Sequence, residues 1–357
     1  MSEDARQPDT ILREFLRGQG LVQFDAEATW TPLAGGVSSD IWRVDLPGRS
    51  ICIKRALPRL KVAQPWFAPI ERNAWEWAWI GFAALHCPDA VPAPVASDAR
   101  QGIFAMAYLD PAEYPVWKRQ LLDGVVSEQT AARVGAIVAR LHAASAGDAG
   151  IARRFRTDAI FHAIRLEPYL LATASRHPDL ASRLQALERR TAQTRLALVH
   201  GDVSPKNILV GPRGPVFLDA ECAWHGDPAF DAAFCLNHFL LKCIARPMWS
   251  EAYLGCYRAF CDVYLAGVEW ESRAGLEARI ASLLPALTLA RIDGKSPVEY
   301  IDDEHDRRRV RDFARPLIAD APARLDQVSA RWRAALAAPA ASSPACPLDP
   351  ATRTQQR

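Results

Sequence analysis

Two carboxylates and one amide stand close together between positions 200 and 220. Asp202 follows His200 and Gly201, Asn207 comes five residues after Asp202, and Asp219 ends a later apolar segment. Phosphoryl transfer requires these groups, because one carboxylate orients or accepts the proton of the attacking hydroxyl while a second carboxylate and an amide oxygen hold Mg²⁺ against the nucleotide phosphates. The pattern therefore predicts a phosphoryl-transfer site, with Asp202 as the base and with Asn207 and Asp219 as metal ligands.

Short strands are expected to position these residues. Apolar segments at 196–199, 208–210 and 216–218 flank the polar stretch, and a Gly-Pro-Arg-Gly turn at 211–214 separates the last two. This pattern is typical of strands and loops. It stands between amphipathic segments that repeat every three to four residues. The sequence therefore predicts a small β-structured island inside a helical region.

The N-terminal part has a different texture. Runs of β-branched and aromatic residues, separated by Gly-Gly and Pro-Gly, predict an antiparallel meander followed by one helix and two further strands. The expected strands are 29–33, 40–46, 50–55, 95–98 and 102–109, and the expected helix is 69–86. Asp110 and Pro111 then form a turn and a hinge.

The C-terminal part is predicted to be helical. The expected helices are 127–145, 158–174, 179–194, 228–244, 249–266, 272–291 and 298–332. The result is an α+β fold with four regions. They are an N-terminal extension (1–20), an N-lobe sheet that binds nucleotide (21–109), a helical C-lobe with the catalytic loop and substrate site (110–335), and a disordered tail (336–357) rich in Ala, Pro, Ser and Thr.

The stretch around Asp202 resembles the aminoglycoside phosphotransferase and choline kinase family, small-molecule kinases with a protein-kinase-like two-lobe fold. The H-G-D-x-x-x-x-N signature of that family is complete from His200 to Asn207, and Asp219 stands at the position of its metal-binding Asp. A G-D-P-x-x-D helix start also follows, with Asp227 and Asp231 interpreted as structural residues. The resemblance implies ATP as phosphoryl donor and Mg²⁺ as cofactor.

The resemblance also assigns roles in the N-lobe. The loop 33–40 would cover the nucleotide phosphates, Lys54 on a strand would pair with those phosphates, and a Glu of the helix 69–86 would hold Lys54. Glu71 and Glu76 are both available, and Glu76 fits the family spacing better. The backbone around the end of the strand 102–109 would receive the adenine edge. The expected nucleotide-binding residues are Gly35, Gly36, Ser38, Ser39, Lys54, Glu76, Ala107 and Tyr108.

Other polar residues near the motif receive more modest interpretations. His142 is expected to pack under the catalytic loop, and His200 to support that loop by hydrogen bonding, because Asp202 occupies the position of the base. Lys206 is predicted to reach the γ-phosphate and to stabilise the transferring charge. The segment 294–296, Gly-Lys-Ser, is not a P-loop, because Leu289 stands where the first glycine is required and no strand precedes it. With Arg291 and Glu299 it remains a candidate substrate-side or structural element.

The acceptor is expected to be a small hydroxylated molecule. Seven residues separate Asp219 from Asp227, which leaves no room for the long activation segment that a protein kinase uses to bind peptides. An amino sugar, a sugar, a choline-like, a methylthioribose-like or an amino-acid alcohol acceptor all remain open. Glu221 and Trp224 are possible substrate-side residues, the acidic stretch 302–306 could serve an aminoglycoside, and Trp249 and Tyr253 could add to an aromatic cage for choline. The alternative function is a nucleotide-binding pseudokinase without turnover.

Composition restricts the remaining classes. The 357 residues carry 43 basic and 41 acidic side chains, a formal charge of +2, which disfavours a nucleic-acid-coating protein and a disordered chain. Eight cysteines without a C-x-x-C pair indicate buried free thiols in a reducing compartment. Apolar stretches are interrupted before membrane-spanning length and the N-terminus is polar, so a cytoplasmic protein with no membrane partner is expected. Lysine is rare, and two of six lysines are Lys54 and Lys206.

Overall fold

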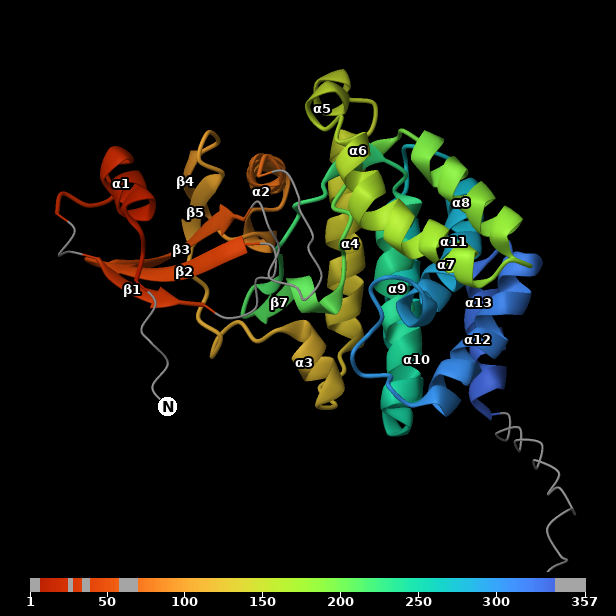
Figure 1. The fold of residues 1–357 in the computed structure, drawn as a ribbon. Coiled ribbons are helices and arrows are strands. Elements are labelled where there is room, and N and C mark those ends of the chain that lie inside the picture. Colours follow the sequence, from red (N-terminus) through yellow and green to blue (C-terminus); the bar gives the residue numbers. More distant parts are fainter. Residues whose placement is uncertain (1–6, 25–27, 34–38, 58–69, 338–357) are drawn as a thin grey trace, which may run out of the picture.

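The computed structural model describes residues 7–24, 28–33, 39–57 and 70–337. Its N-terminal part is a five-stranded antiparallel sheet with the strand order β1-β2-β3-β5-β4. The strands are β1 (Thr29–Pro32), β2 (Ser39–Leu46), β3 (Arg49–Ala56), β4 (Pro94–Asp98) and β5 (Ile103–Ala107), and two helices accompany them, α1 (Thr10–Gly18) and α2 (Arg72–His86). Figure 1 shows this sheet at one end of the molecule and the helical part at the other.

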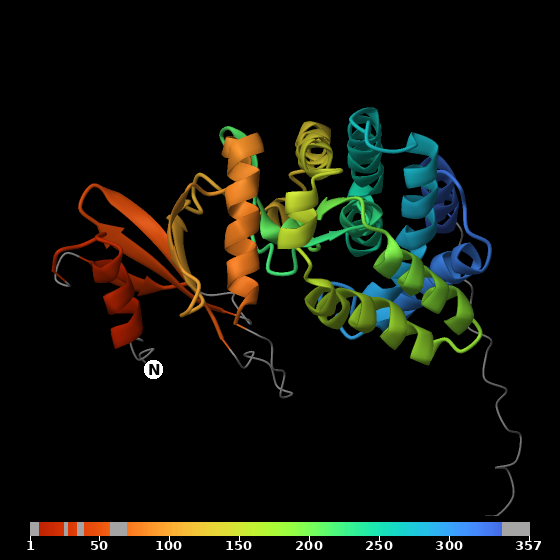
Figure 2. The ribbon, with the colours of Figure 1, turned by 90° about the horizontal axis from the view of Figure 1, so that it is seen from above.

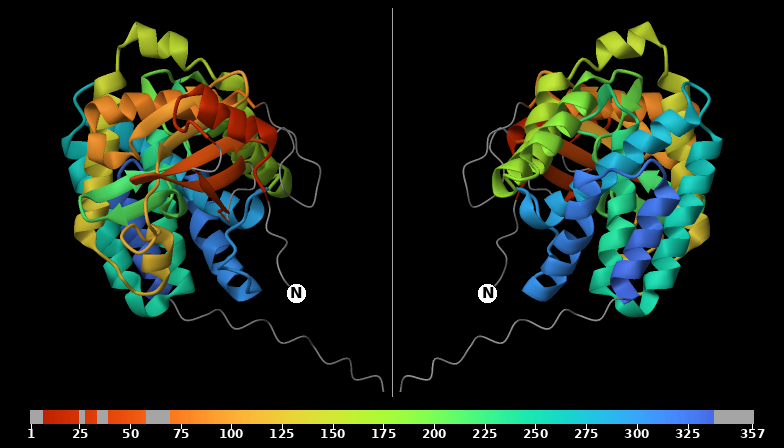
Figure 3. Two further views of the ribbon diagram at one scale, coloured as in Figure 1. Left: turned by 90° about the vertical axis from the view of Figure 1, so that its left-hand side faces the viewer. Right: turned by 90° about the vertical axis from the view of Figure 1, so that its right-hand side faces the viewer.

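The helical part contains the rest of the described chain. Its helices are α3 (Trp117–Leu122), α4 (Glu128–Ser145), α5 (Ala149–Arg154), α6 (Asp158–Phe161), α7 (Ala172–Arg176), α8 (Ala181–Gln193), α9 (Ala229–Ala245), α10 (Ser250–Ala266), α11 (Arg273–Asp293), α12 (Glu304–Ala319) and α13 (Leu325–Ala337), with the π-helical segment η3 (His162–Leu171) and the short 3₁₀ turns η2 (Pro88–Ala90), η4 (Pro205–Asn207) and η5 (Pro247–Trp249). Two small antiparallel pairs join β6 (Ala197–Val199) to β9 (Trp224–Gly226) and β7 (Ile208–Gly211) to β8 (Gly214–Phe217). The two views of Figure 3 show the sheet in front on one side and the C-terminal helices in front on the other.

The predicted α+β, two-lobe fold is confirmed, and the β-structured island is present as β6 to β9. The order of the five strands follows from three antiparallel pairs of consecutive strands, β1–β2, β2–β3 and β4–β5, and from α2, which lies between β3 and β4 in the sequence. Helix α2 lies between the sheet and the helical part in Figure 2. The register pairs Lys54 of β3 with Ile41 of β2 and with Phe104 of β5. Lys54 therefore stands on a central strand, where neighbours on both sides hold its backbone.

No helix was predicted in the segment 1–20, the expected N-terminal extension, but its residues 10–18 form α1, which packs against the sheet. Asp9 caps the helix by accepting a hydrogen bond from the Leu12 amide at 3.1 Å. The apolar face of α1, with Leu12 and Phe15, is buried in one cluster with Trp42. Burial of these side chains explains why the chain before the first strand folds onto the sheet.

Two further expectations on the helices were wrong. The segment 298–332 is not one helix, because Asp303 starts α12 as its N-cap and Pro322 lies in the break before α13. The segment 158–174 is not a regular helix, because its central turns are π-helical around Pro168, which has no N–H to donate. No described helix is long and apolar enough to cross a lipid bilayer.

Candidate active site

The loop that follows β6 is held by its main chain. The Asp231 carboxylate, on α9, accepts hydrogen bonds from the amides of His200 and Gly201, both at 2.7 Å. Gly201 has φ +79°, and a Cβ there would lie 2.9 Å from Cys222 Sγ and 3.0 Å from the Cys222 carbonyl oxygen. Only glycine fits this turn, which presents Asp202 at the start of the catalytic loop, defined here as residues 202–207.

His200 supports this loop as a neutral ring. Its Nδ1 accepts from the Asp202 amide at 3.1 Å, and its Nε2 donates to the Leu218 carbonyl at 3.2 Å. Burial lowers the pKa of His200 below its ordinary value, which keeps Nδ1 free to accept. The ring also meets Trp79 of α2 edge-on, with centroids 4.7 Å apart. His200 therefore links three segments of the site, and both of its ring nitrogens are occupied by hydrogen bonds to the main chain.

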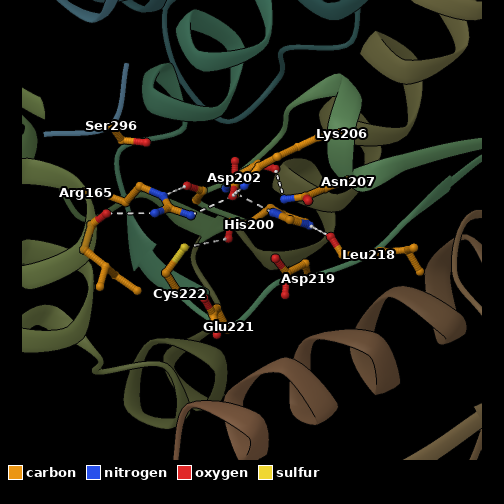
Figure 4. Close-up of polar contacts among 12 residues, drawn as sticks. Arg165, His200, Asp202, Lys206, Asn207, Leu218, Asp219, Glu221, Cys222 and Ser296 are labelled. Carbon is orange, nitrogen blue, oxygen red and sulfur yellow. Dashed lines mark hydrogen bonds and ion pairs between the residues drawn. The ribbon is translucent and has the colours of Figure 1, made fainter. Parts of the chain in front are cut away.

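Asp202, the one carboxylate of the loop 202–207, is held by two basic side chains. Its Oδ2 lies 2.8 Å from Arg165 Nη2 and 3.2 Å from Lys206 Nζ, whereas its buried Oδ1 has no hydrogen-bond partner among the described residues. Burial raises the pKa of the Asp202 carboxyl, but the charges of Lys206 and Arg165 outweigh it, so the pKa lies well below its usual range. The carboxylate is thus ionised, with one oxygen anchored and the other available. Figure 4 shows Arg165 and Lys206 reaching Asp202 from different directions.

Arg165 was not predicted from the sequence. Besides its ion pair with Asp202, its Nε donates to the Gly201 carbonyl at 2.5 Å, so it holds both the side chain and the backbone of the loop. It comes from η3, where the π-helical turns change the direction of every following side chain. The period of a regular α-helix, about 3.6 residues, does not predict on which side of this segment Arg165 lies. The one sequence signal of an irregular helix was Pro168 inside the segment.

Asn207 and Asp219 lie next to each other, as expected of two ligands of one metal ion. The Leu218 amide donates to the Asn207 carbonyl at 2.9 Å, which puts Asp219 beside the loop. The Asn207 side-chain nitrogen donates to the Asp202 carbonyl at 3.3 Å, which leaves the amide oxygen as the free end. Asp219 has φ 67°, the only positive value of a non-glycine residue in the described part of the chain. Two hard oxygen donors, one on a strained backbone, fit a Mg²⁺ ion that keeps further sites for phosphate and water.

Lys54 joins the two lobes. Its Nζ lies 2.6 Å from Glu76 Oε2 on α2 and 2.5 Å from Asp219 Oδ1. Burial lowers the pKa of Lys54, but Asp219 and Glu76 outweigh that effect and raise it, so the ammonium is charged. Of the two glutamates left open by the sequence, Glu76 is therefore the one against Lys54. Glu71 stands at the N-cap of α2, with no side-chain capping bond.

The other expected nucleotide contacts are placed only in part. Gly35, Gly36 and Ser38 lie outside the described residues, and Ser39 is buried at the start of β2. At the end of β5, the amides of Ala107 and Tyr108 donate to the carbonyls of Ala93 and Ser50 at 2.8 and 3.2 Å. These two N–H groups are thus used within the N-terminal part and are not free to receive an adenine edge.

The two possible substrate-side residues, Trp224 and Glu221, have different surroundings in the structure. Trp224 is 1% exposed, stacks on Phe161 at 4.2 Å and donates to Asp158 at 2.9 Å, so it is a core residue and lines no open surface. Glu221 lies near Asp219 in Figure 4, and its carboxylate accepts from Arg72 of α2 at 3.0 Å, a second ion pair between the lobes.

The proposed choline cage and aminoglycoside site are likewise not assembled. Tyr253 is fully buried and donates to the Leu121 carbonyl at 2.5 Å, which places its ring in the core between α10 and α3. In the acidic stretch 302–306, Asp303 accepts from the amides of His305 and Asp306 as the N-cap of α12. Helix capping therefore accounts for the most constrained carboxylate of that stretch.

Residues interpreted as structural have structural partners. His142 lies 3.3 Å from the Asp231 carboxylate and 3.0 Å from the Tyr264 hydroxyl, under the catalytic loop. Asp227 binds Arg279 and accepts from the Ala229 amide at the start of α9.

The segment 294–296 ends α11. Lys295 forms an ion pair with Glu167 at 2.5 Å, and Ser296 accepts from Arg291. Both contacts tie the segment to the helical part and make no phosphate loop. The Cys52, Cys87, Cys222, Cys235, Cys243, Cys256 and Cys261 thiols are free and buried, and Cys346 lies outside the described residues.

The antiparallel sheet, the helical lobe and the loop between Asp202 and Asp219 define a kinase-like protein. The phosphotransferase enzyme family matches residues 29–270, about two thirds of the sequence. The chain therefore belongs to this family, and the resemblance stated from the H-G-D-x-x-x-x-N motif is confirmed.

Named relatives are distant. Methylthioribose kinase of Yersinia pseudotuberculosis is 25% identical over 223 residues, which cover 55% of this chain and 54% of the relative. Methylthioribose kinase 1 of Oryza sativa subsp. japonica is 23% identical over 224 residues, 54% of this chain and 51% of the relative. The chain thus spans about half the length of the curated relatives it matches.

Solved structures agree with the fold. A choline/ethanolamine kinase family protein from Mesorhizobium loti superposes with a TM-score of 0.52 at 16% identity, covering 91% of this chain and 97% of that one. An amicoumacin kinase in complex with AMP-PNP, Ca²⁺ and Ami superposes with a TM-score of 0.54 at 15% identity, covering 89% and 96%. At these identities the similarity concerns the fold alone.

Proposed function

We propose that this chain transfers the γ-phosphoryl group of ATP, with Mg²⁺, to a hydroxyl of a small molecule. The observation that carries the proposal is the state of Asp202. One carboxylate oxygen is fixed by Arg165 and Lys206, and the other is buried and without a partner among the described residues. A buried acceptor of this kind is stable only where something donates to it, and the hydroxyl of an acceptor substrate does so.

Asp202 acts mainly by orientation. Its lowered pKa makes it a weak base, which suits a loose transition state in which the hydroxyl proton leaves late. Oδ1 aligns the hydroxyl with the phosphorus and accepts the proton as the new P–O bond forms. Arg165 keeps the carboxylate in one orientation, and the loop below it is fixed by Asp231. Positioning of this kind contributes to catalysis by lowering the entropic barrier.

Two lysines neutralise the negative charge of the phosphates. Lys54, already bound to Glu76, pairs with the non-transferring phosphates, and Lys206 meets the charge that develops on the transferring group. Lys206 suits that role because its side chain is 51% exposed while its ammonium stays near Asp202. Mg²⁺ bound through Asn207 and Asp219 supplies charge neutralisation of the phosphates.

The acceptor class is open among the compounds of the relatives, which include methylthioribose and choline or ethanolamine kinases by name. The alternative is a nucleotide-binding pseudokinase. It is disfavoured because His200, Asp202, Asn207 and Asp219 are all present and assembled. We also propose a reducing, cytoplasmic location, on the basis of the buried free thiols.

The test is a measurement of ADP formation from Mg-ATP against a panel of hydroxylated metabolites, preceded by a thermal-shift assay with Mg-ATP. A phosphotransferase is stabilised by Mg-ATP and releases ADP with at least one acceptor. A pseudokinase is stabilised by Mg-ATP and releases none with any acceptor, and that result would overturn the proposal.

A further inference from the structure

A group of cationic side chains in the helical lobe is not used by the proposed chemistry. His238 and Lys242 stand on α9, and Arg291 stands near the end of α11. All three are buried, and Lys242 is 0% exposed. Lys242 Nζ, His238 Nε2 and Arg291 Nε have no hydrogen-bond partner among the described residues. Three buried nitrogen atoms without acceptors on neighbouring helices are unusual, because a buried donor without a partner is costly.

The nearby acids do not neutralise this group. Glu299 forms an ion pair with Lys118, and Glu167 forms one with Lys295. Arg291 binds only neutral oxygens, namely the Tyr169 hydroxyl at 3.1 Å and Ser296. Within the described part of the chain, neither Arg291 nor Lys242 has a carboxylate within ion-pair distance.

The group is connected to the catalytic loop by direct contacts. The Arg165 guanidinium, bound to Asp202, lies over the Phe234 ring at 5.8 Å. The same ring meets Tyr169 at 5.4 Å and His238 at 5.8 Å. Arg291 binds the Tyr169 hydroxyl, as described above. These contacts lead from Asp202 through Arg165 and Phe234 to His238, and Figure 4 shows Ser296, which Arg291 binds, on the Arg165 side of the loop.

Tyr300 completes the group. Its hydroxyl lies 3.4 Å from His238 Nδ1, and Lys242 Nζ lies over its ring, 5.1 Å from the centroid. The π-face is a weak partner for a buried ammonium compared with an anion. His238 and Lys242 therefore point toward the same tyrosine, with donor capacity that the ring does not use.

We propose that His238, Lys242 and Arg291 form an anion-binding site on the acceptor side of the catalytic loop, so that the molecule phosphorylated by this chain carries a carboxylate or phosphate group besides its hydroxyl. All three residues come from the helical lobe, whereas Lys54, which faces the nucleotide phosphates, comes from the sheet. The inference rests on the proposed function and deepens it by naming the acceptor class. It also separates this chain from enzymes that take cationic acceptors, since these buried N–H groups lack acceptors and the Arg291 guanidinium repels an ammonium group.

The protonation of Lys242 agrees with this assignment. Burial lowers the pKa of Lys242 to about 7, and the charges of Lys118 and Arg291 act in the same direction, against Cys235 and Glu299. Burial also lowers the pKa of His238, aided by Lys242 and Arg291. An anion placed among these groups favours their charged forms. Binding of an anion near neutral pH is therefore accompanied by proton uptake.

The experiment is a calorimetric titration of the full chain saturated with Mg–AMP-PNP, so that the nucleotide site is occupied. The carboxylate probe is D-glycerate and the phosphate probe is glucose 6-phosphate, with glycerol and glucose as their neutral counterparts and choline as the cation. We expect D-glycerate or glucose 6-phosphate to bind, and glycerol, glucose and choline to bind at least about tenfold more weakly. The two anionic probes distinguish a carboxylate site from a phosphate site. Binding of choline or glycerol in preference to both anions would overturn the inference.

Variants locate the site. Lys242→Met and Arg291→Met each lower the affinity for the bound anion by about tenfold or more, because each removes a buried charge. Lys295→Met is the matched control, since it makes the same substitution at an exposed lysine, and it leaves the affinity unchanged. Two different variants guard against a folding defect, and Mg–AMP-PNP affinity shows whether each variant is folded.

Equal anion affinity in Lys242→Met and the wild type would contradict the proposed anion-binding site. Failure of the wild type to bind Mg–AMP-PNP would instead contradict the proposed phosphotransferase function.

Discussion

The guanidinium of Arg165 lies 2.8 Å from the Asp202 carboxylate, and through a second nitrogen it also holds the Gly201 carbonyl. One side chain from a π-helical segment thus fixes both the carboxylate and the backbone that carries it. Under the proposed function Arg165 is a positioning residue, because it contacts Asp202 and the Gly201 carbonyl and would act on the substrate only through them.

Replacement of Arg165 by Met changes the pH dependence of the reaction. Arg165 helps to hold the pKa of Asp202 below its usual range, so its removal raises that pKa. The carboxylate is active when ionised, and the acidic limb of kcat/KM therefore moves to higher pH in Arg165→Met than in the wild type. Arg165→Lys keeps the charge and restores most of the wild-type profile. A merely structural role of Arg165 would lower activity equally at every pH.

Asp231 is predicted to hold the catalytic loop in place. Its carboxylate accepts from two buried amides at 2.7 Å, so Asp231→Ala lowers the free energy of unfolding by about 3 kcal/mol and lowers kcat as well. Urea denaturation measures the first quantity. Asp262→Ala, at an exposed Asp of α10, is the control and changes stability by less than about 0.5 kcal/mol. A similarly small effect at Asp231 would contradict the assignment.

Alanine substitutions at Gly201 and Gly147 distinguish the destabilisation caused by backbone strain from that caused by a steric clash. Both have a positive φ, +79° and +74°, but a Cβ meets Cys222 only at Gly201, whereas nothing lies within 4 Å at Gly147. Gly147→Ala is expected to destabilise the fold by about 1 kcal/mol. Gly201→Ala adds overpacking and destabilises by about 3 kcal/mol, with loss of activity. Equal melting temperatures for the two variants would show that the contact with Cys222 is unimportant.

Glu76 and Glu71 form a second matched pair. Glu76→Gln removes the charge against Lys54, and the KM for ATP rises, whereas Glu71→Gln leaves it unchanged because Glu71 makes no side-chain capping bond. Lys54→Met has a larger effect, with an increase of about tenfold or more, which corresponds to a charge-assisted hydrogen bond of roughly 1.5 kcal/mol. Steady-state kinetics with varied ATP checks all three. An effect of Glu71→Gln as large as that of Glu76→Gln would contradict the pairing.

Much of the fold was accessible from the sequence because local patterns determine it. The two hairpins around β1 to β3, the helix α2 and the strands around Asp202 followed from residue type and turn residues. Motif spacing brought Asp202, Asn207 and Asp219 together, since all three lie on one short stretch of chain. Helix α1 was missed although Asp9 as N-cap and the spacing of Leu12 and Phe15 are local helix signals; only its packing against Trp42 of the sheet is a tertiary contact.

Residues far apart in the sequence were harder to place. Arg165 reaches Asp202 only because the turns of η3 are π-helical, and no periodic pattern contains that geometry. Trp224 was a possible substrate-side residue because it follows Asp219 closely in the sequence, but its strand β9 pairs with β6 and its ring is buried in the core. Burial on the far side of a short strand cannot be inferred from proximity in sequence.

The central claim is tested most directly by Asp202→Asn, which keeps the shape of the side chain and removes its ability to accept a proton. ADP release is measured with the acceptor found in the metabolite panel, and Mg–AMP-PNP affinity is measured on the same preparation. We predict a loss of kcat of about 10³-fold, with nucleotide affinity close to that of the wild type. Full turnover in Asp202→Asn would contradict the assignment of Asp202 as the group that receives the hydroxyl proton.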